Sequence, residues 1–490
     1  MTLVARTAIA AAALATAAAG AQAITLSVDR LWTYDHALTG VTGQTSEIVS
    51  FDALTGSLWV VGLKGVDVLD AGTGSLLQHL DTSAFGEANS VAIHGGLAAV
   101  AVGAGVKTDP GTVRFYDTAA RSFVGSVGVG ALPDMVAFSA DGSRLLVANE
   151  GEPSAAVDPR GSVSVIDVAS RTEIARAGFD GAITFNGSHI RTFDGIKGGT
   201  TMDFEPEYIA FDASGTKAYV ALQEANAVAT LDLTSNRITT VTGLGVKDFS
   251  QPGNEIDPSD RDGKVELRGA AAFGFYQPDG MASYTAGGET FLVLANEGDS
   301  RADEQDEARA STFGATGDLA RLTVSTADSA PGELYAFGAR SFSIRDTDGN
   351  IVFDSGSQLD AEAIARGIYD DGRSDNKGVE PEGVAIGSIG GRTLAFIGLE
   401  RTTKSAVAIY DITDPANASF VDMIVSDLDL SPEGLSTFTM GGMLYLAVAN
   451  EVSGTTSVFS IAAVPEPGTW ALFAGGLGAI GLLRRRRARD

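Results

Sequence analysis

The sequence predicts an all-β protein, a seven-bladed β-propeller. Three observations predict it: a short β-branched run closing with aspartate recurs along the chain, a strand–turn–strand segment precedes each run, and helical periodicity is almost absent. Each unit is therefore a small antiparallel sheet that cannot bury its faces alone, and such sheets stack around an axis as blades. A β-helix is the alternative, but its repeats are much shorter than these units.

The recurring run supplies one strand of each unit. A seventh copy, from Thr456 to Ile461, lacks the aspartate. The six copies that end in aspartate are Val66–Asp70, Val113–Asp117, Val163–Asp167, Val228–Asp232, Phe342–Asp346 and Val407–Asp411.

A hairpin precedes each run. In the third unit Met135–Phe138 turns at Asp141-Gly142 into Leu145–Ala148, and glycine pairs hold the same turn in later copies, where they supply the positive φ that the turn requires. The first strands begin near residues 48, 90, 135, 208, 280, 383 and 434. Insertions at 179–204, 246–275, 301–332 and 354–379 lengthen the units. The run 25–34 belongs to no unit, and we expect it to close the ring as the outer strand of the last blade.

Both ends differ from the repeats. Residues 1–23 hold Arg6, an Ala/Leu-rich stretch and Ala21-Gln22-Ala23, the pattern of a cleaved secretory signal. Residues 464–490 hold a Pro-Glu-Pro motif, an apolar stretch at 469–483 and a block of arginines. As a helix that stretch is about 22 Å long, a little short of the hydrocarbon core. The predicted domains are a signal peptide (1–23), the propeller (24–463) and a C-terminal segment with a transmembrane helix and an arginine-rich tail (464–490).

The C-terminal segment resembles the PEP-CTERM sorting signal, because Pro465-Glu466-Pro467, the apolar stretch and Arg484–Arg487 occur in the same order. The resemblance implies export in a Gram-negative bacterium and a transient inner-membrane anchor. It also implies recognition by a membrane exosortase, cleavage near Pro467 and delivery to the cell surface or its extracellular matrix. The mature protein is expected to begin near Ile24.

Charge and composition exclude several functions. The chain carries 34 basic and 62 acidic residues, a net charge of −28. Nucleic acid and anionic lipid require basic patches, so we expect neither as a partner. The absence of cysteine excludes disulfides, thiolate metal sites and a cysteine nucleophile.

Carboxylates recur at two positions of five units. A proline–carboxylate pair opens each of these units, and a glutamate follows the second strand 16 to 18 residues later. Because a hairpin returns the chain to its starting point and the inner strand of a blade lines the central channel, all ten side chains are expected around one channel mouth. They are Asp134, Glu150, Glu207, Glu224, Asp279, Glu297, Glu382, Glu400, Glu433 and Glu451.

This ring of carboxylates has two interpretations. Crowded carboxylates repel one another, so the ring is a candidate site for a hard cation, with calcium as the expected cofactor. Alternatively, each carboxylate accepts backbone N–H groups and fixes a loop. Units one and two depart from the pattern, and Lys64 is the expected positive group among them. Arg301 and Arg401, just beyond two of the glutamates, are expected to neutralise part of the charge.

Other motifs carry less information. The loop 257–263 resembles a fragment of a calcium loop, whereas Asp346-Thr347-Asp348-Gly349 is expected to form a β-turn. The sequence has no G-x-S-x-G, H-E-x-x-H or G-x-x-x-x-G-K-[ST] motif. The four histidines share no metal-ligand spacing, and each is expected at the surface or in a turn.

Several segments resemble the choice-of-anchor I family: Leu132–Met135, Val147–Ser154, Ala295–Asp299, Leu334–Phe342, Gly378–Gly383 and Val448–Gly454. The similarity runs over nearly all of residues 25–462. It implies an exported bacterial propeller, in the manner of WD40 and YVTN repeats, with no catalytic set to carry over. Two functions stay open: a calcium-stabilised binding or matrix protein, with extracellular polysaccharide as a candidate partner, and a calcium-dependent phosphoesterase. The second is alkaline phosphatase- or phytase-like and acts on a phosphorylated small molecule, with Lys64, Arg301, Arg340 and Arg401 as its basic groups.

Overall fold

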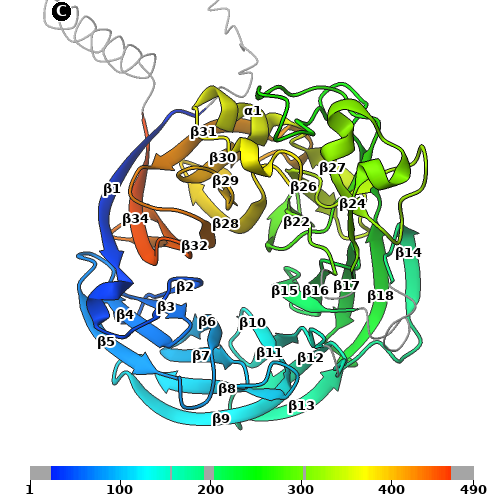
Figure 1. Ribbon diagram of the computed structural model, residues 1–490. Coiled ribbons are helices and arrows are strands. Elements are labelled where there is room, and N and C mark those ends of the chain that lie inside the picture. The colour runs from blue at the N-terminus through cyan, green and yellow to red at the C-terminus, as the bar shows by residue number, and fades with distance from the viewer. Residues whose placement is uncertain (1–23, 155–156, 193–203, 302–304, 465–490) are drawn as a thin grey trace, which may run out of the picture. The chain divides into compact units, whose positions relative to one another are not determined.

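The computed structural model describes residues 24–154, 157–192, 204–301 and 305–464. Within the compact unit Leu26–Ala463, these residues form seven sheets of four or five strands, and the sheets follow one another around a central opening (Figure 1). The predicted all-β propeller is confirmed. Two smaller sheets come from the insertions.

Each blade has four antiparallel strands that follow chain order from the inside outward, except that the outermost strand of the last blade is β1. The first three blades are β2 (Val49–Asp52), β3 (Ser57–Gly62), β4 (Gly65–Asp70) and β5 (Leu76–Asp81); β6 (Ala88–His94), β7 (Leu97–Val102), β8 (Pro110–Asp117) and β9 (Ser122–Ala131); and β10 (Pro133–Phe138), β11 (Arg144–Asn149), β12 (Ser162–Asp167) and β13 (Thr172–Ala177).

The fourth blade has an additional outer strand, β14, that comes from the 179–204 insertion and pairs parallel to β18. The remaining blades are β15 (Pro206–Phe211), β16 (Lys217–Leu222), β17 (Ala227–Asp232), β18 (Arg237–Leu244) and β14 (Thr184–Ser188); β21 (Met281–Ala286), β22 (Glu289–Asn296), β26 (Ser341–Asp346) and β27 (Ile351–Asp354); β28 (Pro381–Ile389), β29 (Arg392–Leu399), β30 (Ser405–Asp411) and β31 (Ser419–Ser426); and β32 (Pro432–Met440), β33 (Met443–Asn450), β34 (Thr455–Ala463) and β1 (Leu26–Asp35).

The ring closes through its first and last segments. The inner strands contact their neighbours in the order β2, β6, β10, β15, β21, β28 and β32, and β32 contacts β2. Strand β1 pairs antiparallel with β34, from Leu26 opposite Ala463 to Asp35 opposite Thr455. The indole N–H of Trp32 donates to the Ala71 carbonyl, 3.0 Å away, and so ties this strand to the first blade. The predicted closing strand is therefore confirmed.

The sequence pattern follows from this packing. Strands such as β3 are buried at every position because neighbouring blades cover both faces of the sheet, so their sequences are continuous apolar runs. Gly142 adopts a φ of 69° in the β10–β11 hairpin, as the turn requires. The recurring aspartates cap turns: Asp70 accepts the N–H of Thr73 at 2.8 Å, and Asp232 accepts that of Ser235 at 2.8 Å.

The insertions form a small structure of their own beside the fourth to sixth blades. It contains β19 (Val246–Asp248), β20 (Phe273–Phe275), β23 (Glu307–Arg309), β24 (Thr323–Ser325), β25 (Tyr335–Ala336), α1 (Gln358–Ala365) and the 3₁₀ turns η3 (Ala310–Phe313), η4 (Gly317–Arg321) and η5 (Asp371–Arg373). Its core includes Phe249, Ile256, Leu322 and Leu334. Two further 3₁₀ turns, η1 (His36–Thr39) and η6 (Pro415–Asn417), lie next to blade strands.

Two loop expectations have outcomes here. Carboxylates of the 257–263 loop are paired with arginines: Asp262 contacts Arg268 at 2.8 Å, and Asp260 contacts Arg321 at 2.8 Å. Arginine side chains therefore stand beside the carboxylate oxygens that a bound cation would need. Asp346 begins a β-turn between β26 and β27, since its carbonyl accepts the Gly349 N–H at 3.1 Å, as predicted.

His36 lies in a turn, η1, which is one of the two expected positions, but it is not at the surface. It is fully buried, and its Nδ1 lies 2.6 Å from Asp67, which also contacts His79 at 2.6 Å. Its Nε2 lies 2.8 Å from the Thr456 hydroxyl. This network joins the segment after β1 to β4 and β34, so the histidine holds the ring closure.

The predicted signal peptide (1–23) and the apolar helix at 469–483 with its arginine tail lie outside the described residues. Among the residues that are described, no helix is long and apolar enough to cross a membrane.

Candidate functional site

The hairpins bring the two carboxylate positions of a blade to the same end. The backbone N–H of Glu150 donates to the Leu132 carbonyl at 2.9 Å, directly before the Pro133-Asp134 opening. Glu400 makes the same bond to the Glu380 carbonyl at 2.9 Å. The predicted pairing of positions across each hairpin therefore matches the strand registers.

The residue before the opening proline is strained in four blades. Leu132, Gln277, Glu380 and Ser431 have φ values of 45°, 41°, 51° and 62°. A non-glycine residue in this left-handed region costs roughly 1 kcal/mol or more. This strained conformation recurs beside the carboxylates. In each of the four blades, the carbonyl of the strained residue accepts an N–H group that follows the second strand.

A buried asparagine positions the second glutamate in three blades. Asn149 is fully buried, accepts the Gly130 N–H at 2.9 Å and donates to the Ser164 hydroxyl at 2.9 Å. Asn296 and Asn450 bond neighbouring strands in the same way. This role was not predicted, although the recurrence of Ala-Asn-Glu in the chain was a signal that could have revealed it.

A cavity of about 400 Å³ lies at this end of the third to fifth blades, and we call it the channel-mouth cavity. Its lining includes one basic residue, Arg301, and eight carboxylates: Asp134, Glu150, Glu152, Glu205, Glu207, Glu224, Asp279 and Asp299. Five of the ten predicted ligands are among them.

Two of these glutamates carry unpartnered oxygens. The residues Glu207 and Glu224 are each 8% exposed, and one carboxylate oxygen of each is buried without a hydrogen-bond partner. Burying an uncompensated carboxylate oxygen is costly. Loop-fixing bonds therefore do not account for these two side chains.

A smaller cavity of about 90 Å³ continues the acidic surface across the channel. Asp134 and Asp279 line both cavities, and Glu382 and Glu433 line the smaller one, each with an unpartnered oxygen. All five first-position carboxylates thus converge on connected space around the inner strands.

The electrostatics reflect this crowding. Burial, reinforced by Glu224, raises the pKa of Asp134 to about 7. Burial raises the pKa of Glu207 well above its usual range, and repulsion from Glu224 adds to it. Burial also raises the pKa of Glu150 well above its usual range, and repulsion from Asp134 adds to it. Without a counter-ion, these carboxyl groups resist full ionisation at neutral pH.

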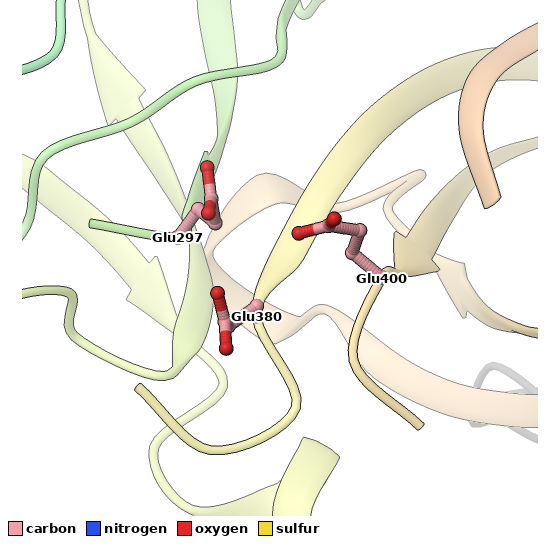
Figure 2. A group of neighbouring side chains, drawn as sticks. All are labelled: Glu297, Glu380 and Glu400. Atoms are coloured by element: carbon pink, nitrogen blue, oxygen red, sulfur yellow. The ribbon is translucent and has the colours of Figure 1, made fainter. Parts of the chain in front are cut away.

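Three carboxylates on the other side of the ring have basic partners. One oxygen from each of Glu297, Glu380 and Glu400 lies within 4.8 Å of the others, and Figure 2 shows the three side chains from different segments turned toward one another. The ammonium of Lys377 lies 2.6 Å from Glu297 and 3.0 Å from Glu380. Arg401 lies 2.7 Å from Glu400.

Lys377 therefore takes the place that a metal ion would have among these glutamates. Burial opposes its charge, but Glu297 and Glu380 outweigh this and raise the pKa of the ammonium group. The sequence indicated Lys64 as the positive group in the ring. No ion pair of Lys64 occurs within the described ranges, and the groups that contact predicted glutamates are Lys377, from the 354–379 insertion, at Glu297 and Arg401 at Glu400.

The basic groups proposed for phosphate chemistry have other partners. Arg340 is buried and donates to the carbonyls of Asp257, Ser374 and Asn376 at 3.1, 2.8 and 2.9 Å. Arg301 donates to the Glu224 carbonyl at 3.1 Å. Arg401 pairs with Glu400, as expected. These bonds hold loops and carboxylates together.

Comparison with known proteins identifies the family. The choice-of-anchor I domain matches residues 47–415. The chain belongs to the choice-of-anchor I family. The match is narrower than the expected 25–462, and it leaves out β1 and the last blade.

The PEP-CTERM protein-sorting motif matches residues 463–487 and confirms the predicted C-terminal signal. This choice-of-anchor I protein is thus an exported, envelope-sorted propeller, and its sorting signal implies processing by an exosortase. No curated protein matches the sequence.

Two solved structures align with this chain at low sequence identity, and the first of them shares the fold. Hydrazine synthase of Kuenenia stuttgartiensis aligns with a TM-score of 0.51 and 13% identity, over 85% of this chain and 96% of that one. The β-propeller domain of Cps50 (Swd1) from Myceliophteria thermophila aligns with a TM-score of 0.46 and 10% identity, over 86% and 97% of the two chains. These similarities concern the fold alone.

Proposed function

We propose that this envelope-sorted propeller binds a hard divalent cation, calcium, in the channel-mouth cavity and serves as a cation-stabilised binding protein of the cell surface or its matrix. The observation that carries the proposal is the pair of buried glutamates, Glu207 and Glu224, whose unpartnered oxygens line an acidic cavity with a single arginine. A bound cation would supply the missing partner for both.

The ligand chemistry favours calcium. All candidate ligands are oxygens, and they come from three different blades. Calcium accepts six to eight oxygens in irregular arrangements, whereas magnesium requires a near-ideal octahedron. Among the described residues, only the Glu297 group brings three carboxylate oxygens within 4.8 Å. Water would therefore complete the coordination in the wider channel-mouth cavity, whose volume of about 400 Å³ has room for it.

The ten predicted ligands take four different roles under this proposal. Asp134, Glu150, Glu207, Glu224 and Asp279 surround the cation, and Glu382 and Glu433 extend the acidic surface. Glu297 and Glu400 are neutralised internally by Lys377 and Arg401. Glu451 lies next to Glu433 and contributes repulsion rather than coordination.

A thermal titration tests the proposal. Calcium should raise the melting temperature of the purified protein, and the double variant Glu207→Gln/Glu224→Gln should lose most of that response. Glu289→Gln is the control, because Glu289 is exposed in the β21–β22 hairpin outside the cavity. A melting temperature that calcium leaves unchanged would overturn the proposal, and an equal response to magnesium would overturn the choice of calcium.

A further inference from the structure

A cavity larger than the channel-mouth cavity lies away from the channel mouth. It has a volume of about 900 Å³ and lies between the outer strand of the third blade, β13, and the outer part of the fourth, β18, together with the loop 178–182. The inner strands β10 and β15 line the channel instead. No residue lines both this cavity and the channel-mouth cavity. We call it the arginine groove, after Arg160, Arg176 and Arg237 in its lining.

The groove reverses the charge of the molecule. The whole chain has 62 acidic and 34 basic residues, yet the groove lining holds three arginines and one carboxylate, Asp180. At physiological ionic strength charges more than about 8 Å away are largely screened. A ligand in the groove therefore experiences the three arginines and the carboxylates paired with them, Asp180 and Glu173, rather than the net charge of −28.

A ligand carboxylate can replace the present partners of these arginines. Arg160 pairs with Asp180, and both side chains are more than half exposed, at 57% and 60%. Arg176 pairs with Glu173 at 2.8 Å on the surface. Arg237 is exposed and has no ion pair within the described ranges. Exposed ion pairs contribute little to stability, so an incoming carboxylate can replace the internal partners.

The remaining lining suits a sugar. Ser235, Asn236 and Thr239 bring hydroxyl and amide groups to the lining, each in one hydrogen bond, with Asp232, Arg144 and the Thr230 carbonyl respectively, and Gly178 and Gly181 leave open space where side chains would otherwise stand. A guanidinium group binds a carboxylate through two parallel hydrogen bonds, which gives both charge and geometric complementarity.

We infer that the arginine groove binds a carboxylated polysaccharide, one that carries uronic acid units, outside the cell. The groove can hold several sugar residues, since a volume of about 900 Å³ is at the upper end for a drug-sized ligand. The three arginines pair with the carboxylates of the uronic acid units, and the hydroxyl and amide side chains form hydrogen bonds with the sugar hydroxyls. This site does not depend on the proposed cation site.

Isothermal titration of the purified protein with an oligogalacturonate hexamer tests the inference. The buffer contains EDTA, so that calcium bridging to the acidic cavity cannot contribute. We expect binding that weakens as sodium chloride rises from about 50 to about 300 mM, and no binding of the neutral maltohexaose at the same concentrations.

The variant Arg160→Ser/Arg237→Ser should bind the hexamer at least tenfold more weakly. The control, Lys217→Ser/Arg261→Ser, removes two exposed charges outside the groove and should bind like the wild type. Equal affinity for both hexamers, equal loss in both variants, or no binding at millimolar hexamer would overturn the inference. Both variants should keep the calcium response, which separates a failure here from a failure of the cation site.

Discussion

Asp134 offers the sharpest test of the charge balance at the channel mouth. It lines both acidic cavities, and burial with repulsion from Glu224 raises its pKa from 3.8 to about 7. A tenfold change in an acid dissociation constant corresponds to about 1.4 kcal/mol. Ionising Asp134 in the folded, cation-free protein therefore costs up to about 4 kcal/mol, an upper value because neighbouring carboxyl groups share protons. Total stabilities are about 5–15 kcal/mol, so this cost is large.

Proton linkage gives the direction of the pH dependence. Between about pH 4 and pH 7 the folded protein holds a proton that the unfolded chain has released, so the cation-free protein loses stability as pH rises through this window. Asp134→Asn removes the ionisable group and keeps the shape. It should be no more stable than the wild type at about pH 4 and more stable by up to about 4 kcal/mol at about pH 8 in EDTA.

Urea denaturation at about pH 4, 6, 7 and 8 measures this difference. Asp348→Asn, an exposed turn residue, is the control and should change little at any pH. With calcium at about a hundred times the dissociation constant, the wild type should gain about 2.7 kcal/mol and the variant less. An Asp134→Asn variant that is equally stable or less stable than the wild type in EDTA at the highest pH would refute this charge balance.

Other parts of the ring give further predictions. Lys377→Met leaves Glu297, Glu380 and Glu400 without their shared ammonium, so the variant should be destabilised in EDTA and bind one more calcium ion in a titration, whereas Lys404→Met, at an exposed pair, should do neither. Asp67→Asn should cost about 3 kcal/mol by thermal denaturation, because it breaks a buried network at the ring closure. Burial opposes ionisation of Asp67, but hydrogen bonds from His36 and His79 outweigh it and hold its pKa low; this stability should be present above about pH 4 and be lost as pH falls below it. Deleting residues 26–35 should expose the edge of β34 and lower the melting temperature strongly, and an unchanged value would contradict ring closure by β1. Mass spectrometry of the surface fraction should find ends near Ile24 and Pro467, and an intact Arg484–Arg487 tail there would contradict processing.

The fold was predictable because its signals are local. A hairpin turn such as Asp141-Gly142 and the aspartate that caps a turn after Val228–Leu231 lie within a few residues of the strands they join. The spacing of the repeat then predicted the positions of the blades. The run 25–34 matched no repeat, which predicted its pairing with the last blade, where it pairs with β34. The fifth strand β14 was not predicted, since it belongs to an insertion and no repeat indicates that this insertion returns to pair with β18.

The site was predictable only where the repeat positions it. The proline–carboxylate openings identified Asp134, Glu207 and Asp279 because strand pairing returns each hairpin to one end. Lys377 was missed because it comes from an insertion, and no periodicity indicates which blade end an insertion reaches. The burial of His36 was missed because its partner Thr456 is 420 residues away in the sequence, and no local pattern indicates such a contact.

The proposed function depends on whether a divalent cation occupies the channel-mouth cavity. A crystal grown with calcium and measured for anomalous scattering answers this by locating the ion itself. We expect an anomalous peak about 2.3–2.6 Å from carboxylate oxygens of Glu207 and Glu224, with water completing the coordination. A cavity that holds only water at saturating calcium, with both glutamates turned toward protein donors, would contradict the proposal.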